Sequence, residues 1–451
     1  MICLGTISCQ KTQVANSRAE EPNPAATADE TVQAGATDPC LMVVAPHQGF
    51  GKTDREILRN QAKIKAAQNI FQSTENLGWL YISKARESFD PGYYKLAEQC
   101  AYCLDSQQPH CAEALLLRGH VLQNLHKFKE AEPLARELVA KRGLSFDYGL
   151  LGDVLMEQGR LEEAADAYQN MVDIKPDLQA YARIAHYRWL KGDLVAATEL
   201  MKMAVSAASP NAPESAAWVN TRLALYQFQA GKVSEANTIC DAALDFQKDY
   251  APALLLRGRL LLADGKTTEA VEALTRAEKL NPLPDYEWVL AEALRAAGSE
   301  AAASTVEARL NQTGTSSDPR TYVLYLSTRG EAGSAAVGLA YDELNTREDV
   351  FTYDALAWAL AADGKPQEAY SRMQNALAEG TQDARLFFHA TMIASKAGHP
   401  AEAADWLGKT VGMMQMLLPS EKKQLQAVAL QLGQAKQSVN TEITTLSSLE
   451  K

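Results

Sequence analysis

The sequence contains no stretch of eighteen uncharged apolar residues, so no segment of it predicts a helix that spans a bilayer. Basic residues are also in the minority, because 44 Lys and Arg stand against 56 Asp and Glu, with a formal net charge of -12. Proteins that bind nucleic acid usually carry a surplus of basic residues on one face. We therefore expect neither a polytopic membrane protein nor a nucleic-acid partner.

Cysteine and histidine are scarce, with seven of each in 451 residues. Seven scattered cysteines are too few for the dense framework of a disulfide-stabilised domain. The sequence also lacks a recognisable nucleophile and base, a zinc-protease helix and a glycine-rich dinucleotide motif. We expect a protein that is not an enzyme and that has no cofactor.

The N-terminal residues leave two alternatives for the location of the chain. Residues 1–9, MICLGTISC, resemble the end of a bacterial lipoprotein signal, although Thr6 stands where a leucine is usual. In that interpretation Cys9 is the lipidated residue and a lipid anchor gives membrane association; in the other, Cys9 is an ordinary cysteine. Residues 10–52 are rich in Ala, Thr, Pro and acidic residues, and we expect a disordered tether there.

Most of the remaining chain follows a repeat. Eight glycines succeed one another at intervals of 32 to 39 residues, and an alanine comes five residues after each of them. Glycine ends a helix in the left-handed conformation with least strain, and a small alanine lets the two helices of a hairpin approach. The pattern predicts an array of helical hairpins. The pairs are Gly159 and Ala164, Gly192 and Ala197, Gly231 and Ala236, Gly265 and Ala270, Gly298 and Ala303, Gly330 and Ala335, Gly364 and Ala369, and Gly398 and Ala403.

Residues 148–176 give the best single unit, and this unit resembles the tetratricopeptide repeat at Leu151, Gly152, Gly159, Ala164, Tyr168 and Pro176. The resemblance implies an all-α, right-handed superhelix, or α-solenoid, of about ten helix-turn-helix repeats. We expect the array at residues 53–414, a capping helix at 415–436 and a frayed tail at 437–451. Residues 75–109 fit the repeat if their hairpin loop is lengthened by about seven residues.

Several stretches, YARIAHYRWLKGDLVAATELM among them, also resemble bacterial exported members of this family that have no established biochemical activity. The resemblance implies a non-enzymatic scaffold that binds an unknown protein or peptide partner in a concave groove. We expect an exported assembly, in the periplasm or anchored to the envelope. The alternative is a cytoplasmic adaptor or regulator.

Aligning the hairpins on their glycines predicts which residues of the first helices face the groove. Tryptophan and arginine dominate binding hot spots, but a tryptophan could equally pack between helices. The candidates are Trp79, His120, Asn124, Asp153, His186, Trp189, Arg259, Trp288, Glu292, Arg295 and Trp358. The Lys, Asn and Arg clamp by which some family members bind chaperone C-termini is missing, and Asp153 and Glu292 would repel an acidic terminus.

Cys100, Cys103, His110 and Cys111 form the densest cluster of metal-ligand residue types. Cys100 and Cys103 share a face if they lie on a helix. Three interpretations stay open: small residues packed between helices, a disulfide, or a metal site. The last would make this a metal or redox protein, and we favour no metal because the spacing matches no common zinc motif.

Overall fold

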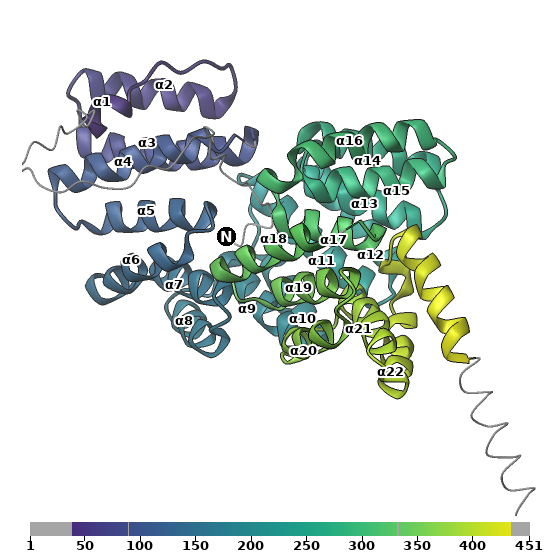
Figure 1. Ribbon diagram of the computed structural model, residues 1–451. Helices are drawn as coiled ribbons and strands as arrows, with labels where there is room; N and C mark the ends of the chain where they lie inside the picture. Colours follow the sequence, from purple (N-terminus) through teal and green to yellow (C-terminus); the bar gives the residue numbers. More distant parts are fainter. Residues whose placement is uncertain (1–37, 89, 332, 434–451) are drawn as a thin grey trace, which may run out of the picture.

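The computed structural model describes residues 38–88, 90–331 and 333–433. In this part of the chain the secondary structure is entirely helical (Figure 1). No helix of the described residues has the length and apolar character needed to cross a bilayer. The predictions for residues 1–9, 10–37 and 437–451, including the lipidation of Cys9, lie outside the described residues.

The helices from α3 to α22 form ten consecutive hairpins in the described part of the chain, which confirms the predicted α-solenoid. The first helices of the hairpins are α3 (Ile70–Ser88), α5 (Ala112–Asn124), α7 (Ser145–Glu157), α9 (Leu178–Leu190), α11 (Pro213–Gln229), α13 (Ala251–Ala263), α15 (Pro284–Ala296), α17 (Pro319–Arg329), α19 (Val350–Ala362) and α21 (Ala384–Lys396). The second helices are α4 (Gly92–Gln107), α6 (Phe128–Lys141), α8 (Leu161–Ile174), α10 (Leu194–Ser206), α12 (Val233–Phe246), α14 (Thr267–Leu280), α16 (Glu300–Ser317), α18 (Gly333–Thr346), α20 (Pro366–Leu377) and α22 (Pro400–Val411).

The hairpin turns follow the predicted chemistry. All eight repeat glycines have a left-handed φ, from +73° at Gly159 to +84° at Gly398. Seven of the eight alanines are buried, and the prediction is wrong only for Ala335, which is exposed. The reason is that α18 begins three residues after Gly330, whereas the other second helices begin two residues after their glycines, so that Ala336 takes the buried position.

The two helices of a hairpin differ in burial. In α7, nine of 13 residues are buried, because the helix packs against α8 of its own hairpin and against α5, α6 and α9 of the neighbouring hairpins. In α8 only five of 14 are buried, and Ala164, Tyr168 and Met171 lie on one helical stripe. The first helices therefore form the core and the second helices form the outer surface.

The first hairpin differs from the predicted one. Helix α3 has 19 residues where α5 and α7 have 13, and only residues 89–91 separate it from α4. The extra residues of 75–109 thus lengthen the first helix, and the prediction of a longer hairpin loop is wrong.

Residues 38–51 are ordered, so the predicted tether is wrong for this part. They comprise α1 (Pro39–Met42) and a segment that leads into α2 (Lys52–Lys65). Val43 is fully buried, and its carbonyl oxygen accepts a hydrogen bond of 2.9 Å from the Tyr81 hydroxyl. A disulfide joins Cys40 to Cys103 of α4. The segment covers the apolar end of the first hairpin and is linked to it covalently.

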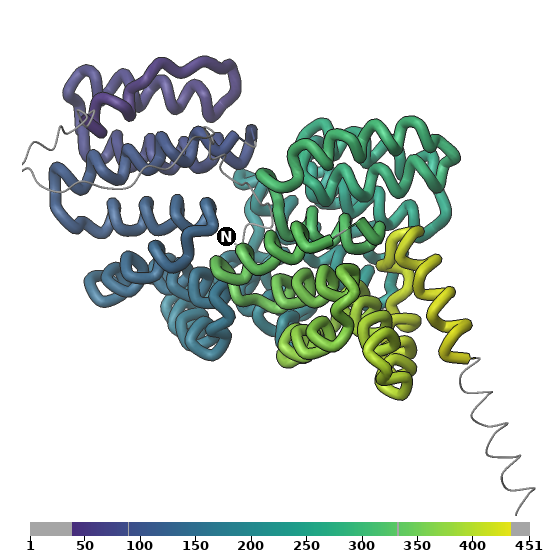
Figure 2. The backbone as a smooth tube through the Cα atoms, viewed as in Figure 1, coloured from purple at the N-terminus to yellow at the C-terminus, as the bar shows by residue number. Residues whose placement is uncertain are grey.

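The superhelix closes on itself, because the connections that precede α19 and α21 contact the hairpin loops that follow α5, α7 and α9. Lys191 pairs with Glu379 at 2.7 Å, and Arg347 pairs with Glu157 at 3.3 Å. In Figures 1 and 2 the green helices α18 and α19 are drawn next to the blue helices α7 and α9, and the contacts lie between the connecting segments. We call this set of contacts the closure.

Two repeat glycines lie at the closure and have a second function there. A Cβ atom at Gly159 would lie 2.5 Å from the carbonyl oxygen of Glu348, and one at Gly192 would collide with the carbonyl oxygen of Gly380. A Cβ at Gly265, which has the same φ of +73° as Gly159, would meet no atom within 4 Å. Gly159 and Gly192 are therefore required by packing as well as by backbone conformation.

The pair Gly159→Ala and Gly265→Ala separates these two requirements. Both substitutions should cost about 1–2 kcal/mol for the left-handed alanine. Gly159→Ala should cost about 1–3 kcal/mol more, because its methyl group overpacks the closure. Urea denaturation of the two variants measures the difference, and small-angle scattering should show expansion for Gly159→Ala alone. Equal losses of stability with unchanged scattering would contradict the closure.

Candidate functional site

The closure encloses a central cavity of about 1170 Å³. Its lining includes residues of α9, α11 and α13, residues 318–324 and 347–353, and residues of α2 and α3. The cavity exceeds the range of roughly 300–1000 Å³ that is usual for small-molecule pockets. Exposed residues such as Glu348 and Asp249 are part of the lining, so the cavity opens to solvent. It is the part of the concave groove that this chain leaves unfilled.

One wall of the cavity combines aromatic and cationic side chains from α9 and α11. The guanidinium of Arg222 donates to Nδ1 of His186 at 3.2 Å and lies 5.6 Å from the centre of the Trp189 ring. Trp189 stacks on Phe351 of α19 with ring centres 5.6 Å apart, and its indole N–H donates to Gln229. This wall is held rigidly by contacts among its own members.

The opposite wall is a network of ion pairs at the closure. Arg320 pairs with Asp349 at 3.0 Å, and Asp349 also caps α19 by accepting from the backbone N–H of Thr352 at 2.7 Å. Arg347 is buried, pairs with Glu157 and hydrogen-bonds the ring of His126. These cations are therefore already neutralised by partners within the chain.

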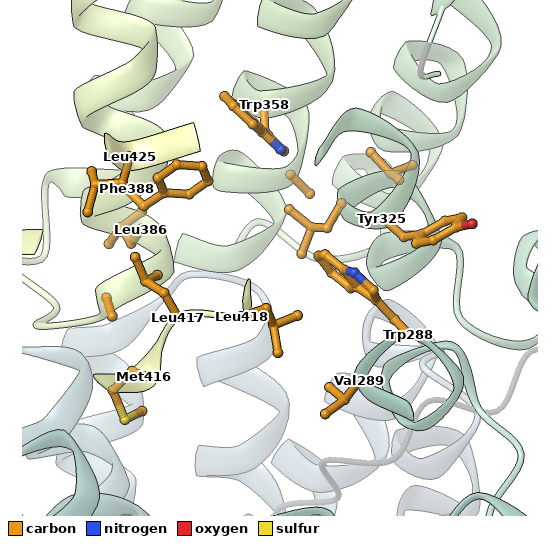
Figure 3. Packing of buried hydrophobic residues seen from close by; sticks show 14 of the residues in the cluster. Trp288, Val289, Tyr325, Trp358, Leu386, Phe388, Met416, Leu417, Leu418 and Leu425 are labelled. Atoms are coloured by element: carbon orange, nitrogen blue, oxygen red, sulfur yellow. The ribbon is translucent and has the colours of Figure 1, made fainter. Parts of the chain in front are cut away.

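The rest of the groove is filled by the C-terminal segment of the same chain. After α22 the chain forms the 3-10 helix η1 (Met414–Met416), which contacts α11, α13 and α21, and then a helix over residues 419–433. Leu417 and Leu418 are buried between α15 and α21, beside Trp288 and Phe388 (Figure 3). The helix predicted to cap the end of the array instead packs against its inner face.

Polar contacts fix this C-terminal segment in the groove. Arg259 donates to the carbonyl oxygen of Met416 at 3.1 Å, and Glu292 accepts from the backbone N–H and the hydroxyl of Ser420 at 3.0 and 2.6 Å. Arg385 pairs with the buried Glu421 at 2.7 Å. The inner helices thus hold a segment of their own chain, in which only residues 417–418 separate η1 from the last helix.

The structure corrects most of the predicted groove residues. Residues on first helices also face the neighbouring helices, and the groove is filled, so seven of the eleven candidates are buried: His120, Asp153, His186, Trp189, Trp288, Glu292 and Trp358. Burial contradicts the prediction of groove contacts for the five that do not line the cavity, namely His120, Asp153, Trp288, Glu292 and Trp358. His186, Trp189 and Arg259 line the cavity, so for them the prediction stays open. Trp358 illustrates the alternative of helix packing, because its indole N–H donates to Thr328 and its ring stacks on His389.

The remaining candidates have partners inside the array. Trp79 is half-buried against the rings of His120 and Phe146. Asn124 donates to the carbonyl oxygen of His120. Arg295 pairs with Glu307 of α16, so it faces its own hairpin rather than the groove.

The buried acid Asp153 is neutralised within the array. Arg183 of α9 donates to both carboxylate oxygens at 2.8 Å, and the Tyr168 hydroxyl adds a third bond at 2.9 Å. The bidentate geometry is the strong form of this interaction. Asp153 therefore connects α7, α8 and α9 and does not offer a free charge to the groove.

The cysteine cluster does not form as a four-residue site. Cys103 is bonded to Cys40, which the sequence interpretation did not consider as its partner, whereas Cys100 and Cys111 are buried free thiols. His110 is exposed and contacts Glu137 at 2.9 Å. The described residues contain no group of three or more His, Cys, Asp or Glu placed to hold a metal ion. Small-residue packing explains Cys100, and a disulfide explains Cys103.

Sequence reasoning missed Arg222, Arg320, Arg347 and Phe351 as cavity residues. Alignment on the glycines gives positions within one hairpin, whereas these side chains meet only because distant hairpins come together.

Burial keeps three histidines neutral, two of which, His126 and His186, line the cavity. It lowers the pKa of His186 and of His120 to about 3, with Arg222 and Arg86 respectively adding to the effect. Burial, followed by the charges of Arg347 and Arg320, lowers the pKa of His126 well below its usual value. His186 accepts from Arg222 through Nδ1, and a proton on that nitrogen would break the bond.

The family model described as "Tetratricopeptide repeat" matches residues 116–179, 150–213 and 255–312. No curated protein matches the chain.

Solved structures match the chain at low sequence identity and low TM-score. PilW, a widely conserved type IV pilus biogenesis factor, is 13% identical with a TM-score of 0.38, covering 45% of this chain and 92% of its own. The Cut9–Hcn1 hetero-tetramer of the APC/C is 12% identical with a TM-score of 0.35, and the match covers 87% of this chain and 98% of the other. A tetratricopeptide repeat protein from Parabacteroides merdae is 19% identical with a TM-score of 0.32, and the match covers 56% of this chain and 98% of the other. These TM-scores are too low to support any partner.

The neutral state of His186 predicts a dependence of stability on pH. Unfolded histidine takes up its proton near pH 6.5 and the folded residue only near pH 3, so stability is complete above about 6.5 and is lost below it. Between pH 7 and pH 5 the free energy of unfolding of the wild type should fall by about 2 kcal/mol more than that of His186→Asn. Urea denaturation at both pH values checks this; the same pH dependence in both proteins would contradict it.

Proposed function

Because this chain is a tetratricopeptide-repeat protein, we propose that it is a non-enzymatic scaffold whose protein partner inserts a segment into the central cavity. Repeats of this kind generally mediate protein–protein interaction. The observation that carries the proposal is the cavity of about 1170 Å³ between α9, α11, α13 and the closure. The C-terminal segment supports it further, since the same inner surface already holds a helical segment of this chain through Arg259 and Glu292.

We place the protein in an exported assembly of the cell envelope. The disulfide between Cys40 and Cys103 supports this setting, because such bonds persist in oxidising compartments and are rare in the cytosol. Cys9, which precedes the disulfide-linked segment, is the proposed lipid attachment site. The alternative function, a cytoplasmic adaptor, would use the same cavity but would keep both thiols reduced.

A bulky side chain in the cavity should block the partner. Ser215 of α11 lines the cavity and is half-buried, whereas Ser234 of α12 is exposed on the outer surface. Ser215→Trp should lower the yield of cross-linked partner in cells about tenfold, and the matched control Ser234→Trp should leave the yield unchanged. Mass spectrometry of the cross-linked products gives the measurement. Equal yields from both variants would place the partner elsewhere.

Fractionation of native cells tests the setting. The chain should sediment with membranes and carry the linked Cys40–Cys103 peptide when digested without reductant. Cys9→Ala should move it to the supernatant with the disulfide intact. A chain found in the cytosol with both thiols free to alkylate would support the adaptor instead.

A further inference from the structure

Helix α2 lies at the N-terminal end of the array. It packs against α3, and Figure 1 shows it as the last helix of the stack formed with α3, α4 and α5. Its inner side is buried at residues such as Ile57 and Gln61, whereas Arg55, Leu58 and Arg59 on its outer side are exposed. The outer side of α2 is therefore accessible to a partner.

The outer side of α2 is basic, although the chain has a net charge of -12. Of the two acids in the helix, Asp54 is buried and pairs with Lys84, and Glu56 pairs with Arg59 at 2.8 Å. The other cations of the outer side form no salt bridge within the described part of the chain. The exposed cations are Arg55, Arg59, Lys63 and Lys65.

An exposed phenylalanine lies next to the start of this helix. Phe50 is 94% exposed, the highest value among the large hydrophobic residues of the described chain. Asp54 holds the loop from below by accepting from the N–H of Gly51 at 2.9 Å, and a Cβ atom at Gly49 would collide with the same carboxylate. Arg55 donates to the carbonyl oxygen of Phe50 at 2.7 Å. The loop is therefore fixed, and it presents Phe50 to solvent beside a cation.

Other apolar side chains are exposed in the same segment. Leu58 of α2 is 42% exposed and lies between Arg55 and Arg59. Single exposed apolar residues are common, but apolar residues interleaved with cations on a helix are typical of surfaces that bind a bilayer. Five of the fourteen exposed large hydrophobic residues of the described chain lie within residues 41–70: Leu41, Met42, Phe50, Leu58 and Ile70. We call Phe50, Leu58 and the four exposed cations the α2 face.

We propose that the α2 face docks on a bilayer that contains anionic phospholipid. Each cation near an anionic membrane surface strengthens binding, and Phe50 and Leu58 supply apolar groups that enter the interface. The surplus of acids in the rest of the chain is repelled by such a surface. Docking therefore orients the array with its N-terminal end toward the lipid.

The α2 face is separate from the proposed partner site. None of its six residues lines the cavity, so the proposal goes beyond the scaffold function and does not depend on it. Cys9, the proposed lipid attachment site, precedes Asp38, the first described residue, by 29 positions. An anchor at Cys9 and the α2 face would thus bring the same end of the chain to the membrane.

Phe50 favours a bilayer over other polyanions. An acidic protein or a nucleic acid would engage the cations alone, because a phosphate or a carboxylate offers nothing to an apolar ring. A bilayer interface accepts both the cations and the ring.

Vesicle sedimentation tests the proposal with the full Cys9→Ala chain, which cannot be acylated at that position. Vesicles rich in phosphatidylglycerol should bind the chain at least about tenfold more tightly than vesicles of phosphatidylcholine alone, and added salt should weaken the binding. Equal binding to both kinds of vesicle, or binding to neither, would overturn the proposal.

Docking through the α2 face alone is weak and reversible, since a single signal of this strength gives only marginal membrane binding. The Cys9→Ala chain therefore still enters the supernatant when cells are fractionated and their lipid is diluted. The vesicle measurement uses excess lipid and detects the docking itself.

Variants locate the binding. Replacing both Lys63 and Lys65 with Gln should weaken binding to the phosphatidylglycerol vesicles about twentyfold, because each cation contributes separately. The matched replacement of Lys232 and Lys279, which are exposed on later hairpins, removes the same charge and should leave binding unchanged. Thermal unfolding followed by circular dichroism should be unchanged in both, because all four positions are exposed. Equal weakening by the two double variants would exclude the α2 face.

Phe50→Ser separates a bilayer from other anionic partners. It should weaken vesicle binding about tenfold, because the ring leaves water when the face docks. If the lysine variant weakens binding and Phe50→Ser does not, the face is a general anion site for an acidic protein or a nucleic acid, and docking on a bilayer is wrong.

Discussion

The contact between distant hairpin loops at the closure determines whether the inner helices line an open groove or a cavity. An open solenoid exposes its inner helices along a continuous groove, and its stability is a sum over neighbouring repeats. Here backbone carbonyls of the later hairpins approach the loops that contain Gly159 and Gly192, because these glycines have no side chain. Lys191 and Arg347 add ion pairs across the contact. Hairpins that are far apart in sequence therefore stabilise one another, and the groove becomes a cavity with two chemically different walls.

The C-terminal segment limits this cavity from the other side. Its leucines complete the core around Trp288, and its polar groups pair with Arg385 and Glu292 on the inner helices. A partner therefore meets a small, shaped site rather than a long concave surface. This arrangement explains why the largest aromatic side chains of the first helices are structural, while the smaller arginine-bearing wall stays accessible.

The sequence predicted the repeat and its turn chemistry because both are local. A left-handed glycine and a small residue five positions later act within one hairpin, and only the one-residue shift at Ala335 escaped. The closure could not be predicted, because it arises from a small rotation per repeat that accumulates until residues such as Lys191 and Glu379 meet. The tryptophans were misplaced for the same reason, since a helix face that looks free in one hairpin is covered by another. The partner of Cys103 lies 63 positions away, beyond any spacing rule.

That disulfide also decides how mechanical load would pass through the molecule. A pull on the chain upstream of Cys40 reaches α4 directly through the covalent bond to Cys103. The residues between the two cysteines, which include α2 and α3, form a closed loop that bears no tension. The first hairpin would stay folded under a force that would strip away an unlinked N-terminal segment, and its face toward the cavity would keep its shape while the chain is held by its end.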